Sequence, residues 1–532
     1  SGQSSNDSGG TLPVAVEINQ IDLPDIALGE ALAGAGIAEL AAKGSLHADP
    51  SPLAIAGDIA VERRDGKEGS VTGTIRFAPT ENLLDLDLRA AEPAGGIIAN
   101  LLRLPGSPAV DIAAKGSGPL SDWSGTSTFR VGGQVAAQLT GRHQLTDTGN
   151  RIEVKGDGEF EQFLPELLKP ILKGGADFDI AGTATTGGGF EIERAAIDSE
   201  SVHVSASGVF DPQTAADIRL EVTAKQGPVV LSLPTGGPPV TLAFDRLSAR
   251  AFGDGREPMV DVTGSLVSVV TGGTEARGLA VQLHSDGFDM TNRTGPLKIS
   301  LAADLLKTDV ATLAPLVAGR VSADLAGTVG RDEVTLDEGT LRSDALDASL
   351  TAKLALSDLA MTLTMRADAV STALPAQLRP VLGPRVQFSA TATRDPKGDF
   401  AANAIELKSG SLSASGTASA SGIDIRADLK GRMDDVSVLS YLTGAGLAGG
   451  IDFALTASGA RTAPDFSISA TSDKLTAAGK AVANLRLAAS GKADIASPTA
   501  DISLTGTVDG QALVLTANLS NADGRRTVDG LS

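Results

Sequence analysis

Apolar and polar residues alternate along short stretches throughout the chain. Residues 84–89 read LDLDLR, and residues 218–223 read IRLEVT. The stretches 423–426 and 484–487 continue the pattern. Alternation with a period of two places the apolar side chains on one face of a β-strand and the polar side chains on the other. The sequence therefore predicts many strands, each with one apolar and one polar face, and something has to cover the apolar face.

Short apolar segments with helical character interrupt these strands about every 65 residues. They begin at positions 97, 163, 310, 374 and 438, and the interval from 163 to 310 is close to two periods with one segment missing. A fixed period of this size indicates a repeat architecture, in which each unit relies on its neighbours to bury its apolar face. We expect four or five strands and one short helix in each unit.

The predicted repeat divides the chain into a flexible leader and seven units. The leader is 1–10, and the units are 11–96, 97–162, 163–230, 231–309, 310–373, 374–437 and 438–532. Unit 231–309 is degenerate, and 438–532 includes a truncated end. Short strands that end in Gly or Asp-Gly predict antiparallel pairing. The candidate turns are Asp65–Gly66, Asp157–Gly158 and Asp523–Gly524.

The predicted fold class is mostly β, an elongated repeat of antiparallel strands curled into an open trough, with short helices every ~65 residues. A long sheet twists and curls, and inward curling places the apolar face inside the trough. The same apolar residues would equally suit an ordinary closed core, and the sequence leaves that alternative open. The candidate lining residues are Val14, Val16, Ile18, Leu84, Leu86, Leu88, Ile218, Leu220, Val222, Met361, Leu363, Met365, Leu485 and Leu487.

Composition narrows the class of partner. The net charge of −21, with acidic residues spread evenly, argues against nucleic acid, because phosphate binding needs clustered Lys and Arg. The chain has no Cys, so disulfides cannot support it, and 14 Phe, one Tyr and one Trp leave the interior mainly aliphatic. No apolar run is long enough to span a bilayer. The chain opens at Ser1 without a signal peptide, so we expect a fragment whose export signal or membrane anchor lies outside it.

Candidate chemistry is sparse. The histidines at 47, 143, 203 and 284 are scattered, and no pair has the spacing of metal ligands. Carboxylate pairs at i and i+2, such as 85 with 87, 177 with 179 and 191 with 193, fall on the polar face of a strand. General acid catalysis needs a more buried carboxyl group. The motif G-x-G-x-x-G at 444–449 precedes a strand instead of a helix. We therefore expect no catalytic residue, no metal and no cofactor, and a function that is not enzymatic.

Residues 92–123 are more specific. The stretch EPAGGIIANLLRLPG at 92–106 leads into PAVDI at 108–112 and GSGPLSDW at 116–123. This sequence resembles the TamB branch of the AsmA-like superfamily, the translocation and assembly module subunit of Gram-negative bacteria. Residues 21–29, 44–46 and 53–61 are also similar to the early region of that family. Beyond about residue 130 only the repeated pattern of alternating strands and short helical segments agrees with that family.

The resemblance implies a periplasmic β-taco, meaning a trough lined with apolar residues. It implies an inner-membrane anchor outside this fragment and a partner barrel of the BamA type (TamA-like) in the outer membrane. It also implies passage of phospholipid between the two membranes, together with an older role in assembling outer-membrane proteins. The localisation it implies is the periplasm, with the full-length protein anchored in the inner membrane.

The leading hypothesis is a bridge that carries phospholipids along an apolar groove. Smooth aliphatic walls suit acyl chains, because each methylene group sheltered from water gains about 0.8 kcal/mol. One alternative is a chaperone or scaffold for outer-membrane β-barrels or autotransporters, which would offer a sheet edge for strand augmentation. A secreted structural β-solenoid is a further alternative, and the ~65-residue period with helical segments disfavours it.

Overall fold

The computed structural model describes residues 14–29, 38–102, 104–159, 161, 164–235, 237–374, 379, 381–440, 444, 446–494, 496–522 and 525–530. The predicted leader 1–10 and the predicted turn Asp523–Gly524 lie outside the described residues. The predicted helical segments beginning at 163, 374 and 438 are described only in part.

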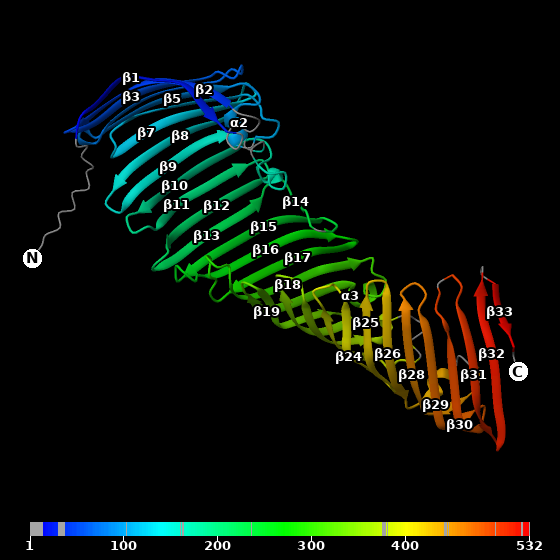
Figure 1. The fold of residues 1–532 in the computed structure, drawn as a ribbon. Helices are drawn as coiled ribbons and strands as arrows, with labels where there is room; N and C mark the ends of the chain where they lie inside the picture. The colour runs from blue at the N-terminus through cyan, green and yellow to red at the C-terminus, as the bar shows by residue number, and fades with distance from the viewer. Residues whose placement is uncertain are drawn as a thin grey trace, which may run out of the picture. The chain divides into compact units, whose positions relative to one another are not determined.

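The described residues form 33 β-strands in an open antiparallel arrangement (Figure 1), and the chain divides into two compact units, residues 1–272 and 273–532. Unit 1 contains β1 (Val16–Leu28), β2 (Ala38–Pro50), β3 (Leu53–Arg63), β4 (Ser70–Ala78), β5 (Leu83–Glu92), β6 (Val110–Gly118), β7 (Asp122–Val131), β8 (Gln134–Thr146), β9 (Gly149–Gly158), β10 (Ala176–Thr185), β11 (Phe190–Ser199), β12 (Val202–Asp211), β13 (Ala215–Ala224), β14 (Val229–Leu233), β15 (Val240–Gly253) and β16 (Met259–Thr271).

Unit 2 contains β17 (Thr274–Ser285), β18 (Gly295–Thr308), β19 (Gly319–Val329), β20 (Glu333–Ser343), β21 (Leu346–Ala355), β22 (Met361–Val370), β23 (Arg385–Arg394), β24 (Phe400–Ser409), β25 (Leu412–Ser421), β26 (Asp424–Met433), β27 (Leu447–Gly449), β28 (Ile451–Ala460), β29 (Asp465–Ala477), β30 (Lys480–Lys492), β31 (Thr499–Val508), β32 (Gln511–Ala522) and β33 (Arg525–Asp529). The predicted fold class, mostly β with antiparallel strands in an open sheet, is confirmed.

Within each unit, nearly every strand pairs with the next strand in the sequence. In unit 1 the exception is β14, because β15 is long enough to pair with β13 through Arg246–Gly253 and with β14 through Val240–Phe244. In unit 2 the short strand β27 pairs with β29, while β26 pairs directly with β28. Neighbour pairing of this kind makes a sheet whose contacts are local in sequence.

Helical segments are short and recur between groups of four strands. They are η1 (Pro79–Glu81), α2 (Ile97–Leu101), η3 (Lys169–Leu172), α3 (Ala314–Val317), η4 (Ser371–Ala373) and η5 (Val436–Leu439). All except η1 follow a strand that runs toward the same edge of its unit, because an even number of antiparallel strands returns the chain to the edge it left. We call this edge the helical edge. The opposite edge carries turns and loops, such as 119–121, 254–258 and 286–294.

Among the described residues, no helical segment lies between β13 and β15, which agrees with the segment missing from the predicted period. The strand β14, which was not predicted, occupies that place. The segment predicted at 310–313 precedes α3, which begins at Ala314. The predicted turn Asp157–Gly158 is wrong, since both residues pair within β9. A two-residue turn with positive φ at both positions, 49° and 84°, occurs instead at Asp509–Gly510, where an I′ hairpin requires it.

The closed parts of the interior are small and lie at the helical edge. In unit 1, Ala99 of α2 and Leu104 pack on Val110 and Val131 at the ends of β6 and β7. A second cluster in unit 1 joins Val202, Val229 and Phe244. In unit 2, Val436 of η5 packs with Met433, Leu475 and Val482. The helical segments therefore cover one margin of the sheet rather than its centre.

A buried ion pair stabilises the helical edge of unit 1 next to α2. The side chains of Arg63 and Glu92 are 4% and 6% exposed, and their charged atoms lie 3.7 Å apart. Glu92 also accepts a hydrogen bond from the backbone N–H of Ile98 in α2 at 2.6 Å. Asp65 receives two further hydrogen bonds from Arg63. Together these contacts join β3, β5 and α2.

Candidate functional site

Cross-strand register aligns apolar residues in one row across unit 1. The row crosses every strand of the unit except β14 and contains only aliphatic residues and glycine. Its members are Ile18, Leu46, Gly57, Ile75, Leu86, Gly116, Gly125, Gly141, Val154, Ile180, Ala195, Ala206, Leu220, Ala249 and Val262. Directly opposed residues in a ladder share a face of the sheet. We call the face that carries this row the apolar face of unit 1.

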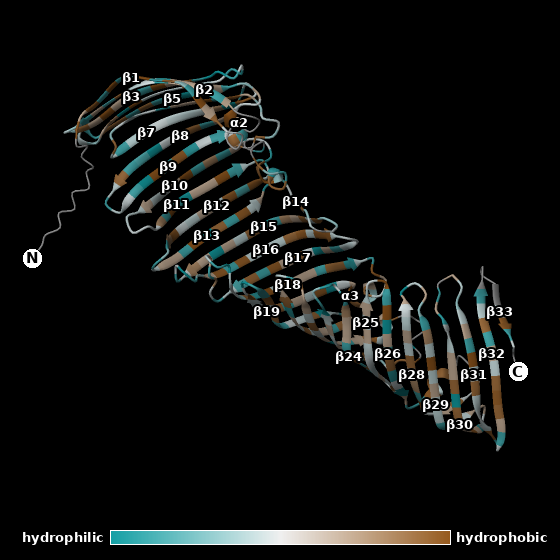
Figure 2. Cartoon of the chain, in the orientation of Figure 1, coloured by the Kyte–Doolittle hydropathy of each residue, from teal (hydrophilic) through white to brown (hydrophobic). Residues whose placement is uncertain are grey.

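Unit 2 has a row of the same kind. It crosses every strand from β17 to β32 except β27, and each member is aliphatic, Phe or Gly. Its members are Val281, Leu301, Ala323, Leu341, Ala348, Ala367, Phe388, Leu407, Ala414, Gly431, Phe453, Ala470, Leu487, Leu504 and Leu515. In Figure 2, hydrophobic and hydrophilic residues alternate along the strands, as the register requires.

The structure places thirteen of the predicted lining residues on these two apolar faces. Ile18, Leu86 and Leu220 belong to the unit 1 row, and Leu487 belongs to the unit 2 row. The others lie two, four or six residues away along the same strands, and so on the same face: Val16, Leu84, Leu88, Ile218, Val222, Met361, Leu363, Met365 and Leu485. Val14 is different, because β1 begins at Val16 and Val14 lies outside the strand with 60% of its surface exposed.

Several residues of the apolar faces were missed from the sequence. Ile75 is one, and it lies between Gly57 and Leu86 in the row. Phe453 in unit 2 is another, and it lies between Gly431 and Ala470. Ile75 belongs to a stretch in which Gly73 takes an alternate position, and counting Gly as a member of an apolar face would have revealed it. Phe453 alternates with Ile451 and Leu455, a pattern that is visible in the sequence.

The centre of the unit 1 apolar face is open to solvent. Ile59 is 49% exposed, Ile75 43%, Ile180 40% and Leu220 41%. At the helical edge, by contrast, Val110 is 2% exposed and Val202 is fully buried. These four side chains lie on β3, β4, β10 and β13. Large aliphatic side chains on one face with nearly half their surface in water form the kind of surface that binds an apolar ligand.

Aromatic side chains lie flat on the apolar faces where glycine makes room. The Trp123 indole Nε1–H donates a hydrogen bond to the carbonyl oxygen of Leu84 at 3.0 Å. A Cβ atom added at Gly116 would stand 2.0 Å from the Trp123 ring, so only glycine fits beneath it. Phe453 covers Gly431 in unit 2 in the same way. Because these rings lie against the glycine backbone, the surface stays apolar and no long side chain projects from it at these positions.

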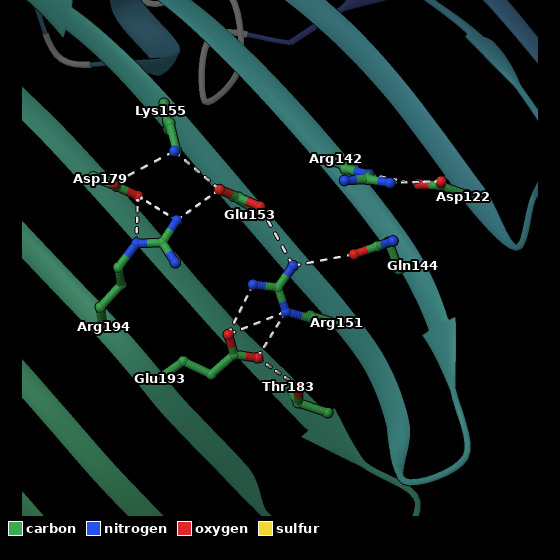
Figure 3. Close-up of polar contacts among 10 residues, drawn as sticks. All are labelled: Asp122, Arg142, Gln144, Arg151, Glu153, Lys155, Asp179, Thr183, Glu193 and Arg194. Carbon is green, nitrogen blue, oxygen red and sulfur yellow. Dashed lines mark hydrogen bonds and ion pairs between the residues drawn. The ribbon is translucent and has the colours of Figure 1, made fainter.

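The opposite face carries a network of charges. In Figure 3, Arg151 lies against Glu193, and Arg194 lies between Glu153 and Asp179. The N–O distances are 2.8 Å for Arg151–Glu193, 2.6 Å for Arg194–Glu153 and 2.9 Å for Arg194–Asp179. The Arg194–Asp179 contact joins the adjacent strands β11 and β10. The other two contacts reach from β9 to β11 across β10. The i, i+2 carboxylates 177–179 and 191–193 fall on strands, as predicted.

The pKa values on this face do not suit proton transfer. Hydrogen bonds from Lys155, Arg194 and Arg151 lower the pKa of Glu153 to about 2. The Arg151 guanidinium likewise holds the pKa of Glu193 below its usual value. A general acid at neutral pH needs a raised pKa, and these carboxylates are held ionised. The arrangement is that of a stabilised polar surface.

The described residues contain no group of three or more His, Cys, Asp or Glu side chains that could hold a metal ion. The acidic residues 332, 333, 337 and 338 therefore do not form such a group. Among the described residues, no helix has the length and apolar character needed to cross a membrane. The surface with a distinctive chemical character is thus the half-exposed apolar face. No model of a known protein family matches the chain, and no curated protein sequence does so either.

Proposed function

We propose that the apolar faces bind the acyl chains of phospholipids and carry them along the sheet between two membranes. The observation that carries this proposal is the continuous row of aliphatic residues in each unit, with large side chains near the centre of the unit 1 face close to half exposed. Acyl chains need non-directional contact, and each buried methylene group contributes about 0.8 kcal/mol. Because the row contains no polar side chain, its selectivity among acyl chains is low.

The cellular setting is proposed from the resemblance of residues 92–123 to the TamB branch. In that setting the protein lies in the periplasm and is held at the inner membrane by an anchor. A BamA-type barrel in the outer membrane receives the lipid. The acidic chain binds no nucleic acid, needs no cofactor and performs no chemical reaction in this role.

Site-specific photo-crosslinking tests the proposal. Leu220 faces the apolar side and Arg219 the polar side of the same strand, β13. A benzophenone amino acid at 220, in the full chain incubated with phospholipid vesicles, should form a covalent lipid adduct detectable by mass spectrometry. The matched pair at 86 and 85 in β5 repeats the comparison on another strand.

The expected result is a lipid adduct at 220 and 86 and little or none at 219 and 85. Equal labelling of both members of each pair would contradict a lipid-binding apolar face. The same variants also test the alternative role as a chaperone for outer-membrane strands. Adducts with an unfolded barrel protein, rather than with lipid, would favour that alternative. Among the described strands, β1 pairs only with β2, which leaves one edge available for such augmentation.

A further inference from the structure

A hollow on the polar face of unit 2 brings several cationic and hydroxyl side chains together. It encloses about 560 Å³ over strands β20 to β24. Three cationic side chains line it, Arg342, Arg366 and Lys408, together with hydroxyl and amide groups. The neutral polar members of the lining are Thr340, Ser349, Gln387 and Ser389.

Strand register places these groups on one face. Asp347 stands opposite Arg342 and Asp368, and Gln387 stands opposite Asp368 and Lys408. In the adjacent row, Arg366 stands between Ser349 and Ser389. Side chains at directly opposed ladder positions project to the same side, so the cations and the hydroxyl groups share the hollow.

The three cations have no acidic partner among the described residues. The nearby aspartates are already engaged by another arginine, because Arg385 lies 2.6 Å from Asp368 and 3.6 Å from Asp347. Many arginines of the polar face of unit 1 are paired, for example Arg250 with Asp217 at 2.9 Å. In this hollow, two guanidinium groups and one ammonium group without an ion pair to any residue that the structure describes lie close together.

The local charge is also unusual for this chain. The lining carries three cations, Arg342, Arg366 and Lys408, and three carboxylates, Asp347, Asp368 and Glu406, so its formal net charge is zero. Arg385, outside the lining, already pairs with the two aspartates. The whole protein carries a net charge of −21, so a neutral hollow with unpaired cations repels an anion less than the rest of the surface does.

We propose that this hollow binds a phosphate ester of a small polyhydroxylated molecule. The guanidinium fork of Arg366 or Arg342 matches two phosphate oxygens, and the serine, threonine and glutamine groups can bond to hydroxyls of the ligand. The volume lies in the range of small-molecule sites. The aromatic residue in the lining, Phe388, belongs to the apolar row, so its ring projects from the other face. Without a ring to stack on, a nucleobase is not favoured, and a sugar or glycerol phosphate is.

Calorimetric titration of the full chain with glycerol 3-phosphate at low ionic strength tests the site. Arg366→Gln should weaken binding by about tenfold or more, since it removes a charge-assisted hydrogen bond. Lys353→Gln is the matched control, because Lys353 lies on the same face and strand group but pairs with Glu333 outside the hollow. It removes the same charge and should change the affinity by less than about twofold.

Lys408→Gln on β24 is a second variant of the hollow that can be tested if Arg366→Gln does not fold. Thermal unfolding of each variant verifies that it is folded. Vesicles that contain phosphatidylglycerol, compared with glycerol 3-phosphate, distinguish a lipid headgroup from a soluble phosphate ester. Loss of binding in the hollow variants supports the site. The probe whose binding is lost shows whether the ligand is a lipid headgroup or a soluble phosphate ester. Equal weakening by Lys353→Gln, or no binding of either probe, would overturn the proposal.

Discussion

At the scale of single residues, the apolar face depends on glycine as much as on leucine. Gly116, Gly125 and Gly141 occupy consecutive positions of the unit 1 row, and the Trp123 ring fills the space above the first two. Alternation in the sequence was enough to place Leu86 and Leu220 on this face. It was not enough to reveal that the Trp123 ring packs on Gly116, because only strand register brings residues 116 and 123 together.

Gly116→Ala should disturb this arrangement. The added methyl group would overlap the Trp123 ring, and overpacking of this kind costs about 1–3 kcal/mol of unfolding free energy. Displacement of the ring should also shift the fluorescence of the single tryptophan to longer wavelength. Gly141→Ala is the control in the same row, because nothing lies within 4 Å of its added Cβ. A similar loss of stability in both variants would contradict the account.

At the scale of elements, strands in unit 1 are joined on their polar face by ion pairs that connect β9, β10 and β11. The predicted i, i+2 carboxylates were identified as a solvated ladder, and the network of Figure 3 includes two of them, Asp179 and Glu193. Their partners could not be predicted. Arg151 and Glu193 are far apart in sequence, and only the register of β9, β10 and β11 brings them together.

This network should make unit 1 sensitive to acid. The pKa of Glu153 falls from its usual 4.5 to about 2 in the fold, so its ionised form is favoured by folding. Its contribution to stability is complete above pH 4.5 and is lost as the pH falls toward about 2. Glu153→Gln should therefore have a lower Tm than the native protein at pH 4.5 and above. The difference in Tm between the two proteins should shrink as the pH falls from 4.5 toward about 2.

Glu191→Gln provides the comparison, since Glu191 lies on β11 without an ion pair among the described residues. Thermal unfolding followed by circular dichroism at several pH values gives both curves. A Tm difference for Glu153→Gln that stays constant down to pH 2 would show that the network does not stabilise the fold.

At the scale of the whole molecule, stability should be local, because strands contact their sequence neighbours and little else within each unit. Sequence periodicity predicted this array and its antiparallel strands. It could not predict β14 or the short β27. Each takes its place because one neighbouring strand, β15 or β29, extends beyond its other partner and leaves hydrogen-bonding groups to be paired.

Local stability has a measurable consequence. Leu455 in β28 lies between Leu429 and Ile468 on the apolar face of unit 2. Leu455→Ala should cost less than the roughly 2–5 kcal/mol of a fully buried leucine, because Leu455 is half-buried. Hydrogen exchange should accelerate in β26, β28 and β29 and remain unchanged in unit 1.

Thr456→Ala changes the neighbouring polar position of the same strand and should leave exchange nearly unaltered. Acceleration throughout the chain after Leu455→Ala would indicate a single cooperative unit instead of an array.

The return of the chain to the helical edge after every fourth strand restricts how such a protein can change in length. Duplicating one group of four strands keeps every later helical segment on its margin and every later aliphatic residue on its side. Inserting a single strand would send all following connections to the wrong margin. Because any even number of strands returns the chain to the same edge, growth by pairs adds about 10 Å per step and growth by whole groups about 19 Å at the usual strand spacing. A sheet of this design therefore changes its length only by even numbers of strands.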